Sequence, residues 1–420
     1  MVKIIFLLIL SLSLSSINSK GIQVKGSKLY DGDGKEFIFR GVNLAHAWYT
    51  DKTKFSINEI SSLGANSARI VLATGAKWTK TSYSELEKII TWCENAGLIC
   101  VLEVHDFTGS DNPTDITNLA LDYWSEMKNL LNEHLNYVIV NIANEWLGTW
   151  NKGSLWGDTY VTAVKSLRAV GIKNALMVDA SGWGQETGPI IKDAKRVLEA
   201  DPDSNVIFSY HVYAALGKDD NSLTSGFDGL KKTGVCWIVG EFGWFHSGAD
   251  VAYKTLMKYC QTNGIGWIAW SWAGNGGDDA CLDLTSASTF SKNDLSDWGK
   301  DVFFGETGIQ KTSKKAYGGA GGNNNNNDDD DKDKDKDDYG YCNGCVVTAT
   351  GTDGSKWGYE NGKSCRIDTN KCKDNSGSDS GKAPNGFPYC TSCDVTVTGD
   401  DGIRWGWENN ESCVINDSKC

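Results

Sequence analysis

The chain has 420 residues, enough for one large domain with smaller modules attached to it. Its formal net charge is −13, from 54 acidic and 41 basic residues, which argues against nucleic acid or an anionic membrane as the partner. The 17 Trp residues either fill a core or offer indole faces on which sugar rings stack. The composition therefore indicates an acidic globular protein and leaves a carbohydrate ligand open.

Residues 1–19 are predicted to be a secretory signal peptide. Lys3 supplies a positive charge, the apolar stretch Ile4–Leu14 follows it, and small serine residues precede the expected cleavage point. This stretch is too short to span a bilayer, and no later apolar stretch reaches the length that a bilayer requires. We therefore expect a secreted, extracellular protein with no membrane partner, in a compartment where disulfide bonds persist.

Residues 20–317 alternate short apolar runs with helical patterns such as Ser82–Asn95 and Thr159–Val170. Eight such units in about 290 residues predict an α/β fold, the (β/α)8 TIM barrel. An open doubly wound sheet is the alternative, but it would need a Gly-rich phosphate loop after its first strand, and none is present. The segment Ile22–Glu36 is predicted to form a hairpin that closes the barrel bottom. The predicted strands begin near Phe37, Ser67, Ile99, Val138, Ala175, Val206, Cys236 and Gly266.

Polar side chains stand where several predicted strands end, and in such a barrel these ends surround the active site. Glu145 and Glu241 are carboxylates on two different strands, as glycoside hydrolysis requires: one protonates the leaving oxygen, and the other attacks the anomeric carbon or activates water. Arg69 is expected to keep Glu241 ionised, and Tyr213 to donate a hydrogen bond to it. Trp270 would form a floor under the sugar. Other strand-end residues are Asn43, His46, Trp48, Glu103, His105, Asp106, Asn144, Trp146, His211 and Trp272.

Other uses of these residues have less support. One Glu at a strand end is often a structural hydrogen-bond partner, but two of them beside Arg, Asn, His, Tyr and Trp favour catalysis. A metal site would need a third ligand near His105 and His211, and the chain has no H-E-x-x-H motif. A serine hydrolase would need G-x-S-x-G after a strand, and this is missing. We therefore expect neither a metal nor a cofactor.

Residues 318–338 are predicted to be a linker. Glycines and asparagines are followed by Asp328–Asp338, a run of Asp and Lys without apolar residues. Such a segment has nothing to bury, its charges repel one another, and it lacks the spacing of an EF-type calcium loop. Two small modules follow, at residues 339–372 and 387–420, and a second linker at 373–386 separates them.

The two modules are a tandem repeat, because four Cys and a Trp-Gly-aromatic-Glu-Asn string recur after 48 residues. Modules of this size bury too little apolar surface to be stable alone, so we expect two disulfides in each. Four Cys allow three connectivities, and all three are open. Zinc is the competing interpretation, but the spacing of the second Cys pair and the secretory route favour disulfides. The repeated Cys are Cys342, Cys345, Cys365 and Cys372, followed by Cys390, Cys393, Cys413 and Cys420.

From Gly21 to Gly308 the chain resembles glycoside hydrolase family 5, in the branch of bacterial-type endo-β-1,4-mannanases. This resemblance implies Glu145 as the acid/base and Glu241 as the nucleophile of a retaining enzyme. The motifs that carry it are Arg40-Gly-Val-Asn43, His46-Ala-Trp48, Ala68-Arg69-Ile-Val-Leu72, Glu103-Val-His-Asp106, Asn141-Ile-Ala-Asn-Glu-Trp146, Leu176-Met-Val-Asp179, Gly182-Trp-Gly-Gln185, Gly240-Glu-Phe-Gly243 and Ala269-Trp-Ser-Trp272. The substrate-binding residues expected around the sugar are Arg69, His105, Asn144, His211, Tyr213 and Trp270, with His46 and Trp48 beyond the first strand.

The implied substrate is β-1,4-linked mannan or glucomannan. Leu44 and Trp244 depart from the family pattern, since many of the mannanases have His at both positions. Both positions are expected to line the cleft, so an endo-β-1,4-glucanase is the alternative enzyme. A catalytically silent barrel that only binds carbohydrate is the non-enzymatic alternative.

The tail modules resemble the dockerin modules of anaerobic fungi, which are related to a small cellulose-binding module family. Tyr341-Cys-x2-Cys345 and Trp357-Gly-Tyr-Glu-Asn361 carry this resemblance. It implies that the enzyme docks onto a scaffold protein of a multienzyme complex. Direct binding of cellulose by the modules is the alternative. The expected docking residues are Trp357, Tyr359, Trp405 and Trp407.

Overall fold

The chain divides into two compact units, Met1–Asn324 and Asn325–Cys420. The computed structural model describes residues 21–318, 342, 347–350, 356–360, 363–367, 388–398, 403–408 and 411–416. The predicted signal peptide and the two predicted linkers, apart from Gly318, lie outside these residues. Within the described part, no helix is both long and apolar enough to cross a membrane.

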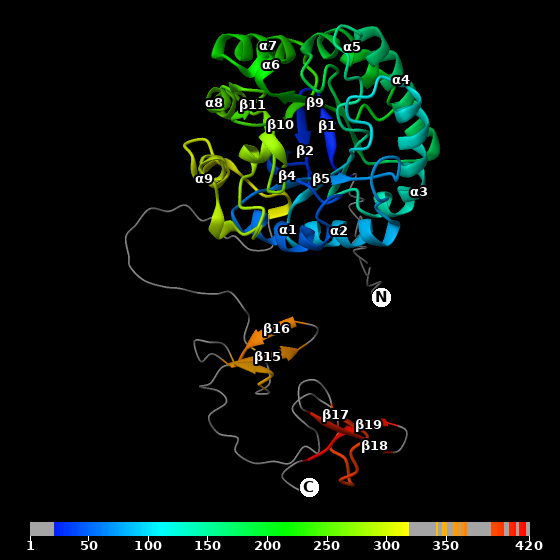
Figure 1. Ribbon diagram of the computed structural model, residues 1–420. Coiled ribbons are helices and arrows are strands. Elements are labelled where there is room, and N and C mark those ends of the chain that lie inside the picture. The colour runs from blue at the N-terminus through cyan, green and yellow to red at the C-terminus, as the bar shows by residue number, and fades with distance from the viewer. Residues whose placement is uncertain are drawn as a thin grey trace, which may run out of the picture. The chain divides into compact units, whose positions relative to one another are not determined.

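Eight parallel strands close into a barrel surrounded by helices, which confirms the predicted fold class (Figure 1). Each strand is almost entirely buried, because its inner face fills the barrel and its outer face packs against the helices. The barrel strands are β4 (Arg40–Leu44), β5 (Ser67–Leu72), β6 (Ile99–Val104), β7 (Val138–Asn141), β8 (Ala175–Asp179), β9 (Val206–Val212), β10 (Trp237–Phe242) and β13 (Gly266–Ala269). The main helices are α1 (Thr53–Ser62), α2 (Tyr83–Asn95), α3 (Ala120–Glu133), α4 (Gly153–Val170), α5 (Thr187–Glu199), α7 (Asp220–Lys232), α8 (Tyr253–Asn263) and α9 (Asp297–Phe304), with short α6 (Ala214–Gly217) and α10 (Ile309–Thr312).

The barrel bottom is closed by a three-stranded antiparallel sheet, in place of the predicted hairpin. Its strands are β1 (Gln23–Lys25), β2 (Lys28–Tyr30) and β3 (Glu36–Phe37). The first barrel strand was predicted to begin near Phe37, but Phe37 belongs to this sheet and β4 begins at Arg40. The segment from Phe37 to Val42 is mostly apolar and almost entirely buried, Arg40 included, so the pattern does not mark where the chain passes from one sheet to the other. Phe37 and Phe39 pack into the cluster that fills the barrel bottom.

A buried ion pair lies at the barrel bottom, just beyond the end of α5. Both carboxylate oxygens of Asp201 accept hydrogen bonds from Arg168, at 2.8 Å each. The backbone amides of Asp203 and Asn205 donate to the same carboxylate at 3.0 Å. Burial acts to raise the pKa of Asp201, but these hydrogen bonds and the charge of Arg168 outweigh it and hold the pKa below its ordinary value.

We predict that Asp201→Asn lowers the free energy of unfolding by about 3 kcal/mol at neutral pH, because a buried guanidinium loses its charged partner. The folded-state pKa is depressed, so this contribution is present above about pH 4 and is lost as the pH falls through the folded pKa. Urea unfolding at several pH values, followed by Trp fluorescence, measures both effects. Asp203→Asn, at an exposed position, is the matched control. Equal stability of Asp201→Asn and wild type at neutral pH would contradict the prediction.

Candidate active site

Arg69, on β5, is the centre of a buried polar network inside the upper barrel. Its guanidinium donates to Oε1 of Glu241 at 2.8 Å and to the side-chain oxygen of Asn144 at 2.7 Å. Burial alone would lower the pKa of Arg69, but Glu103 and three further carboxylates raise it above its ordinary value, so the group stays a cation. Its remaining hydrogen bonds go to Asn141 at 2.9 Å, Asn43 at 3.0 Å and Asp179 at 3.3 Å.

Glu241 lies near the end of β10 and receives two hydrogen bonds. Arg69 donates to Oε1, and the hydroxyl of Tyr213 donates to Oε2 at 2.9 Å. The pairing of β9 with β10 shifts register at Gly240, and such bulges re-aim neighbouring side chains. A Cβ at Gly240 would lie 2.1 Å from the Oγ of Ser209, so no larger residue fits there.

Glu145 follows β7 on a segment with unusual backbone geometry. Its φ is +44°, in the left-handed region that L-residues rarely adopt. Its amide donates to Oδ2 of Asp179 at 3.0 Å, which holds this conformation. The side chain is buried, and its Oε1 lies 2.7 Å from Nδ1 of His211. Burial raises the pKa of Glu145 to about 8.

The two glutamates face each other at close range. One oxygen of Glu145, one oxygen of Glu241 and a ring nitrogen of His211 all lie within 4.8 Å of one another. Burial raises the pKa of Glu241 as well, and the charge of Glu145 adds to this rise. Two carboxylates this close disfavour each other's ionisation. The hydrogen bonds from Arg69 and Tyr213 favour the ionised form of Glu241, so Glu145 is the better candidate to stay protonated.

Both glutamates open into a surface cleft of about 210 Å³. Trp270, just after β13, forms one wall, and its ring stacks against His105 at 5.8 Å between centroids. The indole nitrogen of Trp270 donates to Asn275, which fixes the ring. The lining residues are His105, Asn144, Glu145, Trp183, Tyr213, Glu241, His246, Trp270, Asp279 and Leu282.

The structure brings together the two glutamates and six of the predicted substrate-binding residues, but it separates His46 from them. His46 is buried away from the cleft, with Nδ1 2.7 Å from the Thr53 hydroxyl and Nε2 3.3 Å from Glu85. A histidine two residues beyond a strand end can face either the cleft or the adjacent helix, and the sequence does not distinguish the two. Trp48 stands beside the cleft residue His105, with ring centroids 5.2 Å apart.

The cleft and its network also contain residues that the sequence interpretation did not assign. Asp179 ends β8 and satisfies the same strand-end criterion, so that signal was available. Trp183 and His246 lie on connecting segments, where no periodic pattern marks them; His246 belongs to the short hairpin strand β11 (Phe245–His246), which pairs with β12 (Ala249–Asp250). Asn43 and Asn141 support Arg69 from the barrel interior.

Leu44 and Trp244 are predicted to line the cleft, but neither is among the residues that line it around the two glutamates. Leu44 is buried in the apolar layer between barrel and helices. The indole nitrogen of Trp244 donates to the backbone oxygen of Cys281 at 2.8 Å, and its ring packs behind the cleft against the cluster that contains Tyr213, Trp270 and Leu282. The departure at Leu44 therefore gives no support to a change of substrate.

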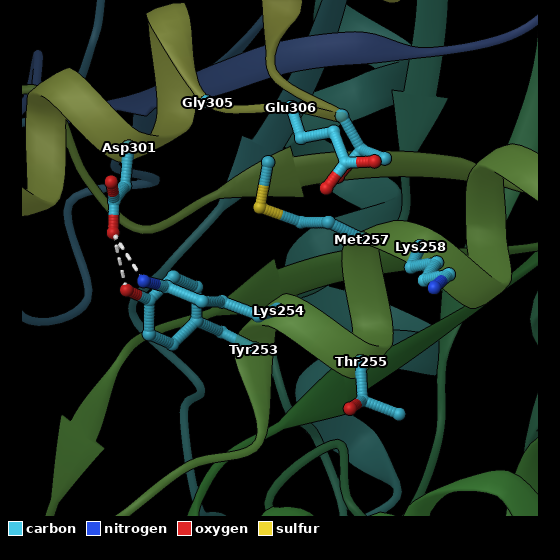
Figure 2. Close-up of a pocket in the computed structure, with 9 residues that line it drawn as sticks. Tyr253, Lys254, Thr255, Met257, Lys258, Asp301, Gly305 and Glu306 are labelled. Carbon is cyan, nitrogen blue, oxygen red and sulfur yellow. Dashed lines mark hydrogen bonds and ion pairs between the residues drawn. The ribbon is translucent and has the colours of Figure 1, made fainter.

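A second pocket, of about 330 Å³, lies between the start of α8 and the end of α9 (Figure 2). None of the predicted site residues lines it. Figure 2 shows Tyr253 and Lys254 both directed at Asp301, and the contacts are 2.5 Å and 3.3 Å long. These polar groups satisfy one another, so the pocket lacks a free reactive pair.

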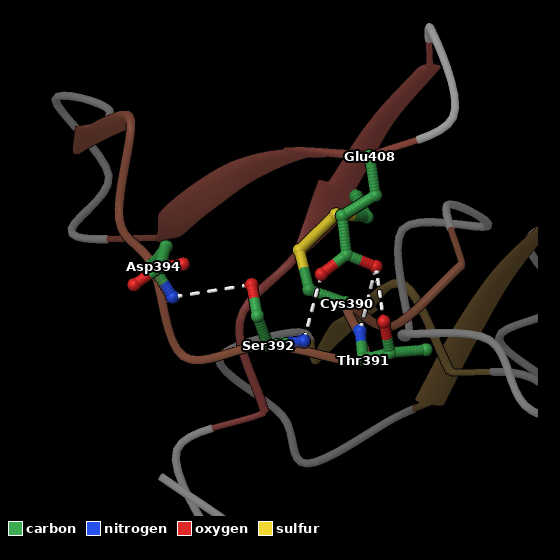
Figure 3. Close-up of a disulfide and its surroundings, with 6 residues drawn as sticks. Cys390, Thr391, Ser392, Asp394 and Glu408 are labelled. Atoms are coloured by element: carbon green, nitrogen blue, oxygen red, sulfur yellow. Dashed lines mark hydrogen bonds between the residues drawn. A yellow bond between two sulfur atoms is a disulfide. The ribbon is translucent and has the colours of Figure 1, made fainter.

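The second tail module is organised around the disulfide Cys390–Cys413, one of the pairings that the sequence left open (Figure 3). These two sulfurs are therefore not metal ligands. A Cβ at Gly406 would lie 2.7 Å from Sγ of Cys390, so the Gly of the repeated string is required by this contact. Glu408 of the same string accepts hydrogen bonds from Thr391 and Ser392, which lower its pKa to about 2.

The opposite face of this module carries two exposed apolar side chains, Trp407 and Val397. Trp405 and Trp407 alternate with Gly406 and Glu408 along β18 (Arg404–Glu408), so they share the face away from the disulfide. Trp407 is 60% exposed, and Val397, paired with Trp405 across the sheet with β17 (Val397–Thr398), is 58% exposed. The third strand is β19 (Glu411–Val414). In the first module, Trp357 and Tyr359 lie on β15 (Lys356–Glu360), between β14 (Ala349–Thr350) and β16 (Lys363–Arg366), but their side chains are outside the described part of the chain.

The chain is similar to known proteins along most of its length. Residues 333–367 and 379–415 match the model described as a cellulose or protein binding domain. A mannan endo-1,4-beta-mannosidase of Salipaludibacillus agaradhaerens is 41% identical over 294 residues, which cover 70% of this chain and 94% of the relative. A mannan endo-1,4-beta-mannosidase of Streptomyces lividans is 39% identical over 83% of this chain and 88% of its own length.

Solved structures agree with these sequence relatives. A beta-mannanase from Streptomyces thermolilacinus, solved with mannohexaose, superposes with a TM-score of 0.66 at 38% identity, covering 70% of this chain and 97% of that one. A cellulase with 18% identity and a TM-score of 0.58 shares the fold. Residues 30–276 match the model for cellulase, glycosyl hydrolase family 5. The chain therefore belongs to glycosyl hydrolase family 5 and is a glycosidase.

Proposed function

We propose that the protein is a secreted, retaining endo-β-1,4-mannanase that its tail modules attach to a multienzyme complex. The observation that carries the mechanism is the short distance between the carboxyl groups of Glu145 and Glu241, whose facing oxygens lie within 4.8 Å. Retaining glycosidases place this pair about 5–5.5 Å apart, whereas inverting enzymes leave room for a water molecule. Mannan as substrate is supported by relatives of at least 37% identity that are named mannan endo-1,4-beta-mannosidases.

In the first step, an ionised oxygen of Glu241 attacks the anomeric carbon while Glu145 gives its proton to the departing glycosidic oxygen. In the second step, water hydrolyses the covalent glycosyl-enzyme. The Glu145 carboxylate takes a proton from this water as its oxygen attacks the anomeric carbon and releases Glu241. Arg69 and Tyr213 hold Glu241 in place, and the wall formed by Trp270 offers an aromatic face to the sugar ring.

The tail proposal rests on the exposed Trp407 and Val397 of the second module and on its match to cellulose or protein binding domains. The signal-like segment Met1–Ser19 supports export, which would give the enzyme access to plant cell-wall polysaccharide. Action on β-1,4-glucan is the second candidate, because a relative named beta-mannanase/endoglucanase A is 36% identical over 267 residues. Comparative rates on unsubstituted mannan, glucomannan and soluble cellulose decide between the two substrates.

We predict that Glu241→Gln abolishes turnover of mannan but keeps affinity for mannohexaose, because it removes the covalent step and little ground-state binding. Glu145→Ala should lose a factor of about 10²–10⁴ on mannan and recover its first step with an aryl mannoside whose leaving group needs no proton. Steady-state kinetics and titration calorimetry measure these effects. Equal recovery of both variants on the aryl substrate, or NMR detection of an inverted first product, would contradict the assigned roles.

We predict that kcat/KM for mannohexaose falls as the pH rises through about 8, because Glu145 must be protonated to act as the acid and its pKa is raised to about 8. On the aryl mannoside, whose leaving group needs no proton, the wild-type enzyme should lack this alkaline limb. The same limb on both substrates would assign the titration to another group.

We predict that the second tail module binds the multienzyme complex through the face that exposes Trp407. The test uses the full chain with Glu241→Gln, which prevents turnover. Adding Trp407→Ala should weaken binding to the purified complex at least about tenfold by surface plasmon resonance, since such anchors dominate interfaces. Phe304→Ala, an exposed aromatic on the barrel, is the control. Trp407-dependent retention on insoluble cellulose, with no binding to the complex, would instead favour the cellulose-binding alternative.

A further inference from the structure

Asp179 is a buried carboxylate that connects the two halves of the catalytic site. It ends β8, and its side chain has no exposure to solvent. Its Oδ2 accepts hydrogen bonds from the amide of Glu145 at 3.0 Å and from Arg69 at 3.3 Å. Its Oδ1 accepts a hydrogen bond from Asn141 at 3.1 Å. Asp179 therefore holds the backbone of one catalytic glutamate and the guanidinium that binds the other.

The ring of His211 lies between Asp179 and Glu145. Its Nδ1 is 2.7 Å from Oε1 of Glu145 and 3.6 Å from Oε2 of Glu241, and its Nε2 is 3.6 Å from Oδ2 of Asp179. Among the described residues, Nε2 has no hydrogen-bond partner. Burial lowers the pKa of His211, which favours the neutral ring with a single proton.

The position of that single proton decides what Glu145 can do. A proton on Nδ1 would be donated to Oε1 of Glu145 and would favour the ionised carboxylate. A proton on Nε2 faces the charge of Asp179 and leaves the Nδ1 lone pair free to accept the proton of a neutral Glu145. The second arrangement keeps the acid protonated for the first chemical step.

We propose that Asp179 is a positioning residue for the acid/base step: it keeps the proton of His211 on Nε2, so that Nδ1 accepts a hydrogen bond from protonated Glu145. Its hydrogen bond to the Glu145 amide also maintains the left-handed backbone that carries this side chain. The inference rests on the proposed role of Glu145 as acid/base. Asp179 does not touch the sugar, and it acts only through Glu145, His211 and Arg69.

The charge of Asp179 is one of several that face Glu145. Burial is the largest influence that raises the pKa of Glu145, and Asp179 and Glu103 add to it, whereas His105 and Arg69 oppose it. Removing the charge of Asp179 leaves Arg69 less compensated, so the pKa of Glu145 should fall. Besides Asp179, the charged and titratable groups around Glu145 come from several elements. They are Arg69 of β5, Glu103 and His105 at the end of β6, His211 and Tyr213 at the end of β9, Glu241 of β10, and Tyr160 of α4 behind Asp179.

The tautomer of His211 can be observed directly in the unmodified full-length enzyme. The chain has five His, so ¹⁵N-histidine labelling gives few signals, and the His211 signals are those missing from a His211→Gln sample. We expect ¹⁵N shifts of the Nε2–H tautomer at neutral pH. The Nδ1–H tautomer, or a doubly protonated ring, would overturn the proposal whether or not any Asp179 variant folds.

Asp179→Asn tests the consequence for catalysis. We expect kcat/KM for mannohexaose to fall at least about tenfold and its alkaline limb to move about one pH unit lower. The control is Asp201→Asn, which also removes a buried, Arg-paired carboxylate, but at the barrel bottom; its alkaline limb should stay at the wild-type position. A merely structural Asp179 would lower the rate without moving the limb, and that outcome would overturn the proposal. If the wild-type enzyme kept the same alkaline limb on the aryl mannoside as on mannohexaose, the proposed role of Glu145 as the acid would fail instead.

Discussion

The hydrogen bond and ion pair between Arg69 and Glu241 is the interaction on which the catalytic centre depends. Glu103, Asp179 and Glu241 all lie within 4 Å of the buried guanidinium, and several carboxylates could not share a closed barrel without a permanent cation. The same cation donates a hydrogen bond to only one of the two cleft glutamates. Glu241 accepts a charge-assisted hydrogen bond from Arg69, whereas Glu145 is desolvated by burial and contacts His211. Unequal access to one guanidinium therefore stabilises the ionised form of Glu241 more than that of Glu145.

Much of this centre could be predicted from the sequence, because a parallel barrel gathers its strand ends at one rim. Seven of the eight strand starts lie within one residue of their predicted positions, since buried runs bounded by polar segments are distinct patterns. The exception is the first strand, because one buried segment contributes first to the bottom sheet, at Phe37, and then to the barrel, from Arg40. Glu145 and Glu241 follow from the same rule.

What the sequence could not provide is the direction of individual side chains beyond the strand ends. His46 points to α1 and α2 instead of the cleft, and Leu44 faces the helical layer. His246 reaches the cleft from a hairpin whose residues have no periodicity. The backbone of Glu145, with its positive φ, also has no signal in a chain that usually reserves such geometry for Gly. These details are set by tertiary contacts, and Asp179 supplies one of them.

The repeated Trp-Gly-aromatic-Glu string lies on one strand, so its alternate residues face opposite sides of the module. In the second module, Gly406 and Glu408 face the disulfide and the loop beside it, where Glu408 is already bonded to Thr391 and Ser392. Trp405 and Trp407 face the other way, beside uncharged cross-strand neighbours. Among the described residues, the cross-strand neighbours of these two Trp are Val397, Val414 and Ser412, so a partner that meets Trp407 finds aromatic area beside uncharged side chains. Attachment through such apolar contacts would depend weakly on ionic strength, because salt screens charges and not apolar contacts.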